Sequence, residues 1–209
     1  MSEKTKTNKS DKALKIVFGV VWILFIVLLV YKCISWFKAS YDLDMYVKNA
    51  NIQQLNDYLY IEEGCSLDEA ELTEEFINAL PASFWNDFRN DNGTIYILKN
   101  IPIDNVIGRT ELKTNTIYIK DGYVFYALAH EFFHYYLHNN PINDFTDIYE
   151  EEAKDFIEAY YGEDSEYYYN DEEEYLCQLF QTVFVIGRED KFGVAPKSWN
   201  FMVDIIDAM

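Results

Sequence analysis

Three histidines, His130, His134 and His138, recur at four-residue intervals in one short stretch of the sequence. In an α-helix, which turns about 100° per residue, His134 would lie about 40° and Glu131 about 100° around from His130. Two imidazoles one turn apart on a helix suit tetrahedral zinc. Glu131, beside them, could take a proton from an attacking water and pass it to a leaving amine. These residue types at this spacing predict the metal site of a zinc-dependent peptidase.

The same pattern has a purely structural explanation, namely a buried histidine pair with a surface glutamate between its members. The rest of the predicted helix is apolar, and a polar group set into it without a partner would be strongly destabilising. A zinc ion would satisfy both imidazoles at once, which favours the metal site. The apolar side comprises Phe125, Leu128, Ala129, Phe132, Phe133, Tyr136 and Leu137.

His138 is a poor third ligand, because it would lie about 12 Å along the helix axis from His130. The other familiar histidine pattern needs a histidine at position 140, which is Asn140. A carboxylate from elsewhere must complete the site. Glu151 with Asp155 resembles the arrangement in thermolysin-like enzymes, although it leaves little chain to turn a second helix back onto the metal. The residues alone leave open Glu150, Glu151, Glu152, Glu158, Glu172, Glu173 and Glu174.

Two C-terminal segments, residues 171–180 (DEEEYLCQLF) and 195–201 (APKSWNF), resemble the anthrax-lethal-factor-like zinc metallopeptidases, which include the secreted Pro-Pro endopeptidases. The resemblance covers roughly residues 90–209. In this family the second glutamate of an acidic pair is the third zinc ligand, which implies Glu174. A tyrosine seven residues earlier stabilises the oxyanion of the tetrahedral intermediate, which implies Tyr167.

Two positions depart from the family's pattern. Phe133 stands where the family usually has glycine, and its place on the apolar side predicts a change in packing rather than in chemistry. Gln178 stands where the family has a second glutamate that supports the site. Its amide oxygen could still accept a hydrogen bond from a histidine, but a neutral group tunes the metal less strongly, so activity could be reduced. The resemblance also implies that substrate lies extended along Thr116–Lys120 as an edge strand.

The hydrophobic patterns predict strands followed by helices, which is typical of an α+β fold. We expect a small zincin-like metallopeptidase domain, with a short sheet packed on the histidine helix and a helical C-terminal half. The predicted strands are Thr94–Leu98 and Thr116–Lys120. Helices are predicted around residues 46–59, in two pieces over residues 67–90 with an interruption at Pro81, and at 123–138, 147–161, 172–185 and Pro196–Ala208.

An uninterrupted apolar run of 16 residues, from residue 16 to 31, predicts one transmembrane helix. This is slightly short of the usual length of about 20 residues, but Lys32 can extend its charge to the interface and Trp36 lengthens the stretch. A cleaved signal peptide is the rival explanation. Its apolar run should be shorter, and Phe37 would occupy a position where the cleavage site needs a small side chain.

The positive-inside rule orients the predicted anchor, since five lysines precede it and two follow it. We expect a cytoplasmic tail at 1–15, an anchor at 16–37, a juxtamembrane segment at 38–66 and the metallopeptidase domain at 67–209. The catalytic domain would lie outside the cell, on a bacterial surface. A protease with its zinc site inside the bilayer does not fit, because the histidine helix is short and polar along one face.

The charge is divided unevenly along the chain. Residues 1–38 hold 7 basic and 2 acidic residues, or +5, and the remainder of the 17 basic and 36 acidic residues is 10 and 34, or −24. Such a domain would repel nucleic acid and attract a basic peptide. The spacing of Cys33, Cys65 and Cys177 suggests no disulfide framework, and we expect Cys65 and Cys177 to be free thiols.

Two other functions remain open. The main alternative is a non-catalytic surface protein of the same fold, which Gln178 favours and the intact Glu131 opposes. The other is a cytosolic protease that cleaves repressors, which the long anchor opposes. The sequence makes no prediction of the oligomeric state or of the bond that is cleaved.

Overall fold

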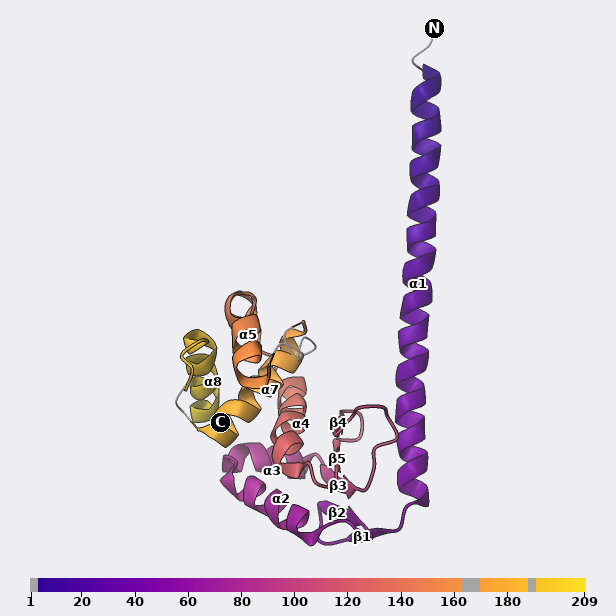
Figure 1. Ribbon diagram of the computed structural model, residues 1–209. Helices are drawn as coiled ribbons and strands as arrows, with labels where there is room; N and C mark the ends of the chain where they lie inside the picture. The colour runs from indigo at the N-terminus through magenta and orange to yellow at the C-terminus, as the bar shows by residue number, and fades with distance from the viewer. Residues whose placement is uncertain (1–3, 163–169, 188–190) are drawn as a thin grey trace. The chain divides into compact units, whose positions relative to one another are not determined.

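The computed structural model describes residues 4–162, 170–187 and 191–209 (Figure 1). The chain separates into two compact units, Met1–Lys48 and Asn49–Met209. Nearly all of the helix α1, Lys4–Asn49, which is 46 residues long, lies in the first unit. Its apolar part is long and apolar enough to cross a membrane by length and composition.

The second unit contains a five-stranded mixed sheet of order β1-β2-β3-β5-β4. The three central strands, β2 (Leu59–Glu62), β3 (Thr94–Leu98) and β5 (Thr116–Lys120), are parallel. At the two edges, β1 (Ile52–Gln54) and β4 (Gly108–Glu111) pair antiparallel with their neighbours. The strands predicted at Thr94–Leu98 and Thr116–Lys120 are present with the predicted bounds.

Two expectations about this sheet are wrong. The helix expected around residues 46–59 does not form, because α1 ends at Asn49 and the following residues pair as β1 and β2. Buried Leu59 and Ile61 anchor β2 in the core. The compact unit begins at Asn49, within the stretch expected as a juxtamembrane segment at 38–66. Thr116–Lys120 is also not an edge strand, since β5 lies between β3 and β4.

Side chains alternate between the two faces of the central strands, as they must at a period of two residues. The isoleucines of β3 and β5 are fully buried and belong to the hydrophobic core. On the alternate positions, Tyr60, Tyr96 and Tyr118 are paired in register across the three parallel strands. Their rings stack, with centroids 4.8 and 5.4 Å apart, which stabilises the sheet across the strands.

Six further helices are described in the second unit. The sequence predicts them to within one or two residues, including the break at Pro81. In Figure 1, α5, α7 and α8 gather on the side of α4 away from the strands. The helices are α2 (Leu67–Ala79), α3 (Ala82–Asn90), α4 (Val124–Asn139), α5 (Thr146–Tyr161), α7 (Glu172–Ile186) and α8 (Pro196–Ala208).

The histidine helix α4 is the centre of this unit and packs against α2, β4, β5 and α7. Phe132 is fully buried, and its ring contacts Phe84 and Phe88 at centroid distances of 5.0 and 4.8 Å. Phe133 is also fully buried and stacks on Phe180 of α7 at 4.3 Å. The Phe133 ring therefore packs α4 against α7. Phe125 differs from expectation, because it is exposed near the start of α4.

Candidate metal centre

Helix α4 brings His130 and His134 together one turn apart. Their Nε2 atoms lie 3.2 Å from each other. His130 and Glu131 are both buried, with 8% of each residue exposed. Ligand atoms about 2.0 Å from a tetrahedral zinc ion lie about 3.3 Å apart. The separation of the two imidazoles therefore fits one shared ion.

The start of α7 supplies carboxylates to the same place. Asp171 caps this helix, and its Oδ1 accepts hydrogen bonds from the backbone N–H groups of Glu173 and Glu174 at 2.9 and 3.2 Å. Acidic side chains are stabilised in the first turn of a helix by the helix dipole. The cap fixes the first turn of α7, and that turn packs against α4 where the histidines project.

Glu174 is the carboxylate that faces both histidines. Its Oε2 lies 3.2 Å from His130 Nε2, and its Oε1 lies 3.7 Å from His134 Nε2. Together with the 3.2 Å between the imidazoles, these distances are close to the edges of a zinc tetrahedron, about 3.3 Å. Two imidazoles and a carboxylate are also the ligand set of many catalytic zinc sites, so these residues fit the metal that the sequence implies.

Glu173 contacts the other nitrogen of His134, with 2.8 Å between its Oε1 and Nδ1. Burial disfavours the charged imidazole, but the bond to Glu173 and the charges of Glu131, Glu174 and Glu173 outweigh it and raise the pKa of His134. The same hydrogen bond lowers the pKa of Glu173 despite its partial burial. A carboxylate on Nδ1 directs Nε2 towards a metal, which is a common arrangement around ligating histidines.

Glu131 is held by the edge strand β4. The Thr110 hydroxyl lies 3.0 Å from Glu131 Oε2 and donates to the Glu131 backbone oxygen at 2.6 Å. Gly108 allows the close approach, because a Cβ atom there would lie 2.7 Å from Glu131 Cγ. Sequence reasoning missed both residues, since β4 is short and has no apolar alternation to reveal it.

The other predicted site residues have different surroundings. Gln178 is buried on α7, and its side chain hydrogen-bonds the hydroxyl of Tyr161. Tyr167 lies outside the described residues. Glu151, a rival third ligand, forms an ion pair with Lys197 instead. Of the candidate carboxylates in the described part of the chain, Glu174 thus has the clearest ligand geometry.

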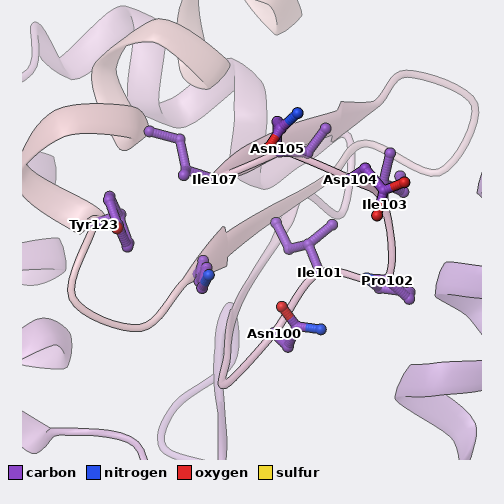
Figure 2. Close-up of a pocket in the computed structure, with 10 residues that line it drawn as sticks. Asn100, Ile101, Pro102, Ile103, Asp104, Asn105, Ile107 and Tyr123 are labelled. Atoms are coloured by element: carbon purple, nitrogen blue, oxygen red, sulfur yellow. The ribbon is translucent and has the colours of Figure 1, made fainter.

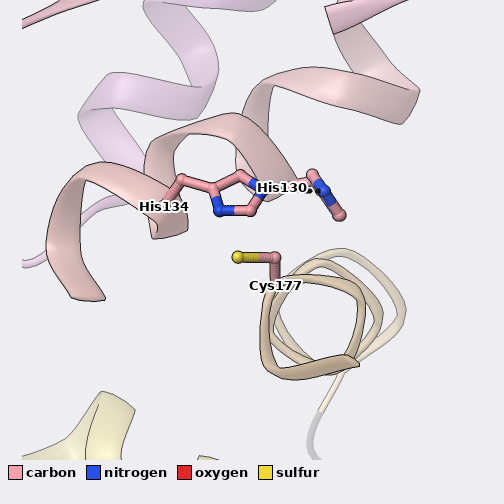
Figure 3. Close-up of side chains that lie close together, drawn as sticks. All are labelled: His130, His134 and Cys177. Carbon is pink, nitrogen blue, oxygen red and sulfur yellow. Dashed lines mark hydrogen bonds between the residues drawn. The ribbon is translucent and has the colours of Figure 1, made fainter. Parts of the chain in front are cut away.

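A thiol lies beside the histidines. Cys177 is fully buried on α7, one turn after Glu174. Its Sγ and one nitrogen from each of His130 and His134 all lie within 4.8 Å of one another, and Figure 3 shows the three side chains together. Burial, followed by the charges of nearby carboxylates, raises the pKa of the Cys177 thiol well above its usual value.

A pocket of about 580 Å³ is lined by residues that fall between β3 and α4 in the sequence (Figure 2). The segment 100–107 forms most of its wall, and Lys120 and Tyr123 complete it. Lys120 Nζ lies 5.6 Å from the centre of the Tyr123 ring, a cation–π contact. Ile107 of this wall is followed directly by Gly108 of β4, which places one end of the pocket next to the strand that holds Glu131.

Comparison with family models and with curated protein sequences gives no match. Comparison with solved structures finds the same fold in a peptidase. The chain is similar to the Pro-Pro endopeptidase PPEP-2 from Paenibacillus alvei, with a TM-score of 0.53 and 16% sequence identity. The similarity covers 70% of this chain and 96% of that protein. This similarity supports the mixed α+β fold of the chain.

Proposed function

We propose that this chain is a membrane-anchored, extracellular zinc endopeptidase. The observation that carries the proposal is the cluster of His130, His134 and Glu174, whose donor atoms are spaced for one tetrahedral ion, with Glu131 beside them. The fold similarity to a Pro-Pro endopeptidase supports a peptidase rather than another use of such a cluster.

The proposed chemistry assigns a separate task to each residue. A zinc ion held by His130, His134 and Glu174 would acidify the attacking water and polarise the scissile carbonyl. Glu131 accepts the proton of that water and later donates it to the leaving amine. The Thr110 hydroxyl contacts both the backbone oxygen and the carboxylate of Glu131 and so holds this residue against β4.

Two further roles follow from the family resemblance. Tyr167 would donate a hydrogen bond to the oxyanion of the tetrahedral intermediate. Gln178 would support the site on α7 as a neutral group, next to Tyr161. Glu173 takes the position on His134 Nδ1 that a supporting carboxylate needs, which reduces the demand on Gln178.

The substrate is a peptide or protein that binds as an extended chain along β4. This strand lies at the edge of the sheet and is attached to Glu131 through Thr110. A peptide that adds to a sheet edge gains main-chain hydrogen bonds, and pockets along the edge select its side chains. The pocket beside Gly108 is suited to one such side chain. The edge strand for substrate is thus β4, in place of Thr116–Lys120.

The N-terminal helix would anchor this enzyme in the cell membrane and set its orientation. The lysines before the apolar run would hold the N-terminus in the cytoplasm and the second unit outside. The strong negative charge of the exported part, −24 after residue 38, favours basic substrates and disfavours nucleic acid.

The alternative function is a surface binding protein that keeps this fold but has weak or no activity. Gln178 favours it, because the family's glutamate is replaced by a neutral side chain. An inactive protein would still bind one metal ion, so metal content alone does not distinguish the two functions.

The test is reversible removal of the metal from the full chain in detergent micelles. We expect about one zinc ion per chain, loss of cleavage of a mixed peptide library on chelation, and recovery when zinc is returned. His134→Ala should lose both metal and cleavage, whereas the exposed His138→Ala should keep both. Bound zinc without cleavage in any condition would support the binding protein, and a chain that binds no zinc would refute the proposal.

A further inference from the structure

Cys177 is a potential metal donor that the proposed set of three ligands does not use. Its side chain is fully buried on the face of α7 that packs against α4. It lies one helical turn after Glu174, and residues three apart on a helix project from the same side. The carboxylate of Glu174, which faces the histidines, and the thiol of Cys177 are therefore neighbours on α7.

The distances show how close the thiol is to a ligand position. Cys177 Sγ and one nitrogen of each histidine lie within 4.8 Å of one another. Nitrogen and sulfur ligands of one tetrahedral zinc ion, bound at about 2.0 and 2.3 Å, lie about 3.6 Å apart. The present separations therefore exceed those of a shared zinc ion by at most about 1.2 Å.

We infer that Cys177 is a fourth protein ligand of the ion held by His130, His134 and Glu174, an inference that rests on the proposed function. The thiol proton passes to the solvent as the sulfur–metal bond forms, because the thiolate is the ligand form of cysteine. The protein would then supply imidazole, carboxylate and thiolate donors to the ion.

This ligand set has a consequence for regulation. Four protein ligands are typical of closed zinc sites, whereas catalytic sites keep one position open. The resting site would therefore be closed, and water would enter only when Cys177 leaves or the coordination expands to five. The thiolate would also make the site favour zinc, cobalt and other metals that bind sulfur over magnesium or calcium.

Cobalt(II) substitution of the full chain in detergent tests this inference without any measurement of activity. Cobalt bound to a thiolate gives a strong near-ultraviolet charge-transfer band, which nitrogen and oxygen ligands do not give. The protein is kept reduced with a phosphine, since thiol reductants would give the same band. We expect the band at one cobalt per chain, its loss in Cys177→Ser, and its retention in the matched controls Cys65→Ser and Cys33→Ser.

Each other outcome has a definite meaning. Cobalt bound at one ion per chain with visible ligand-field bands but no thiolate band in the unmodified chain would overturn the role of Cys177 and leave the three-ligand site intact. A band that survives Cys177→Ser would assign the thiolate to another cysteine and also overturn it. Failure to bind cobalt would refute both this inference and the proposed metal site. If Cys177→Ser does not fold, a band that persists in both Cys65→Ser and Cys33→Ser assigns the thiolate to Cys177, because these are the three cysteines of the chain.

Discussion

His134 has a different partner on each ring nitrogen, and this division explains how its position is fixed. Nδ1 is bonded to Glu173 at 2.8 Å, while Nε2 faces His130 at 3.2 Å. With Nδ1 held, the imidazole presents Nε2 to the centre of the cluster. Glu173 therefore acts on the metal through His134 rather than by direct contact.

Glu173→Ala should weaken zinc binding by about 10- to 100-fold, the usual effect of removing a carboxylate behind a ligating histidine. The measurement is competition with a zinc chelator of known affinity. Glu172→Ala is the matched control, because Glu172 lies in the same turn but contacts Thr146 instead. Equal affinities in the two variants would show that Glu173 has no part in holding the metal.

Cys65 gives a second prediction at the scale of a residue. Partial burial, with help from the charges of Asp121 and Glu62, raises the pKa of its thiol to about 11. At pH 8 its thiolate fraction should be about 200-fold lower than that of an ordinary cysteine with a pKa near 8.5. Alkylation at pH 8, followed by mass spectrometry, should therefore modify Cys65 far more slowly in the folded chain than in urea. Equal rates in the two conditions would contradict the raised pKa.

The raised pKa of Cys65 also sets the direction of a stability change. The folded chain keeps this proton to higher pH than the unfolded chain does, so Cys65 contributes stability below about pH 9 that is lost as the pH rises towards 11. Cys65→Ala should show a smaller loss of stability over this range.

At the scale of elements, the contact between β4 and α4 holds the general base. Gly108→Ala should push Glu131 away, because the new Cβ would lie 2.7 Å from its Cγ. A displacement of about 1 Å at a reacting group can cost about 100-fold in rate. We expect kcat to fall by about 10- to 100-fold with zinc content unchanged. Thr114→Ala, at the exposed turn between β4 and β5, is the control, and full activity of Gly108→Ala would contradict this role of β4.

The sequence predicts those elements whose signals are strong and local. Isoleucine alternation marks β3 and β5, Pro196 marks the start of α8, and the histidine spacing marks α4. The strands β1 and β4 were missed because they are short and polar, although each pairs with a strand close to it in sequence. The strand β2 was missed because it is only four residues long and its parallel partner β3 lies far along the chain. The polarity of β4 also hid Thr110 and Gly108, which no local pattern connects with Glu131.

The residues of the candidate site likewise divide into those with a local sequence signal and those without one. His130, Glu131 and His134 follow from spacing on one helix, and Glu174 was implied by the family resemblance. The bond from Glu173 to His134 needs the orientation of α7 against α4, which sequence alone does not define. Cys177 carries no signal in the sequence, because a buried cysteine is usually an ordinary apolar core residue.

At the scale of the whole molecule, the two units differ in charge as well as in structure. The unit Met1–Lys48 holds 8 basic and 4 acidic residues, or +4, and the unit Asn49–Met209 holds 9 and 32, or −23. A field of this sign concentrates positive ligands near the acidic unit and is screened by salt.

For a lysine-flanked peptide, kcat/KM should therefore fall several-fold as ionic strength rises from about 10 mM to about 150 mM, where the Debye length shortens from about 30 to about 8 Å. A glutamate-flanked peptide with the same central residues should show the opposite trend, and a neutral one little change. An identical salt dependence for all three peptides would show that the net charge does not guide substrate binding.

The most direct test of the central claim is the cleavage of a diverse peptide library by the full chain in detergent, beside Glu131→Gln. The substitution keeps the size of the side chain and removes its ability to accept a proton, so the variant should bind zinc normally and lose cleavage by about 100-fold or more. We predict cuts with the unmodified chain that are absent from Glu131→Gln, at bonds that share a sequence preference. Equal cleavage by both chains, or none by the zinc-loaded unmodified chain, would contradict the assignment of this site as the active site of a peptidase.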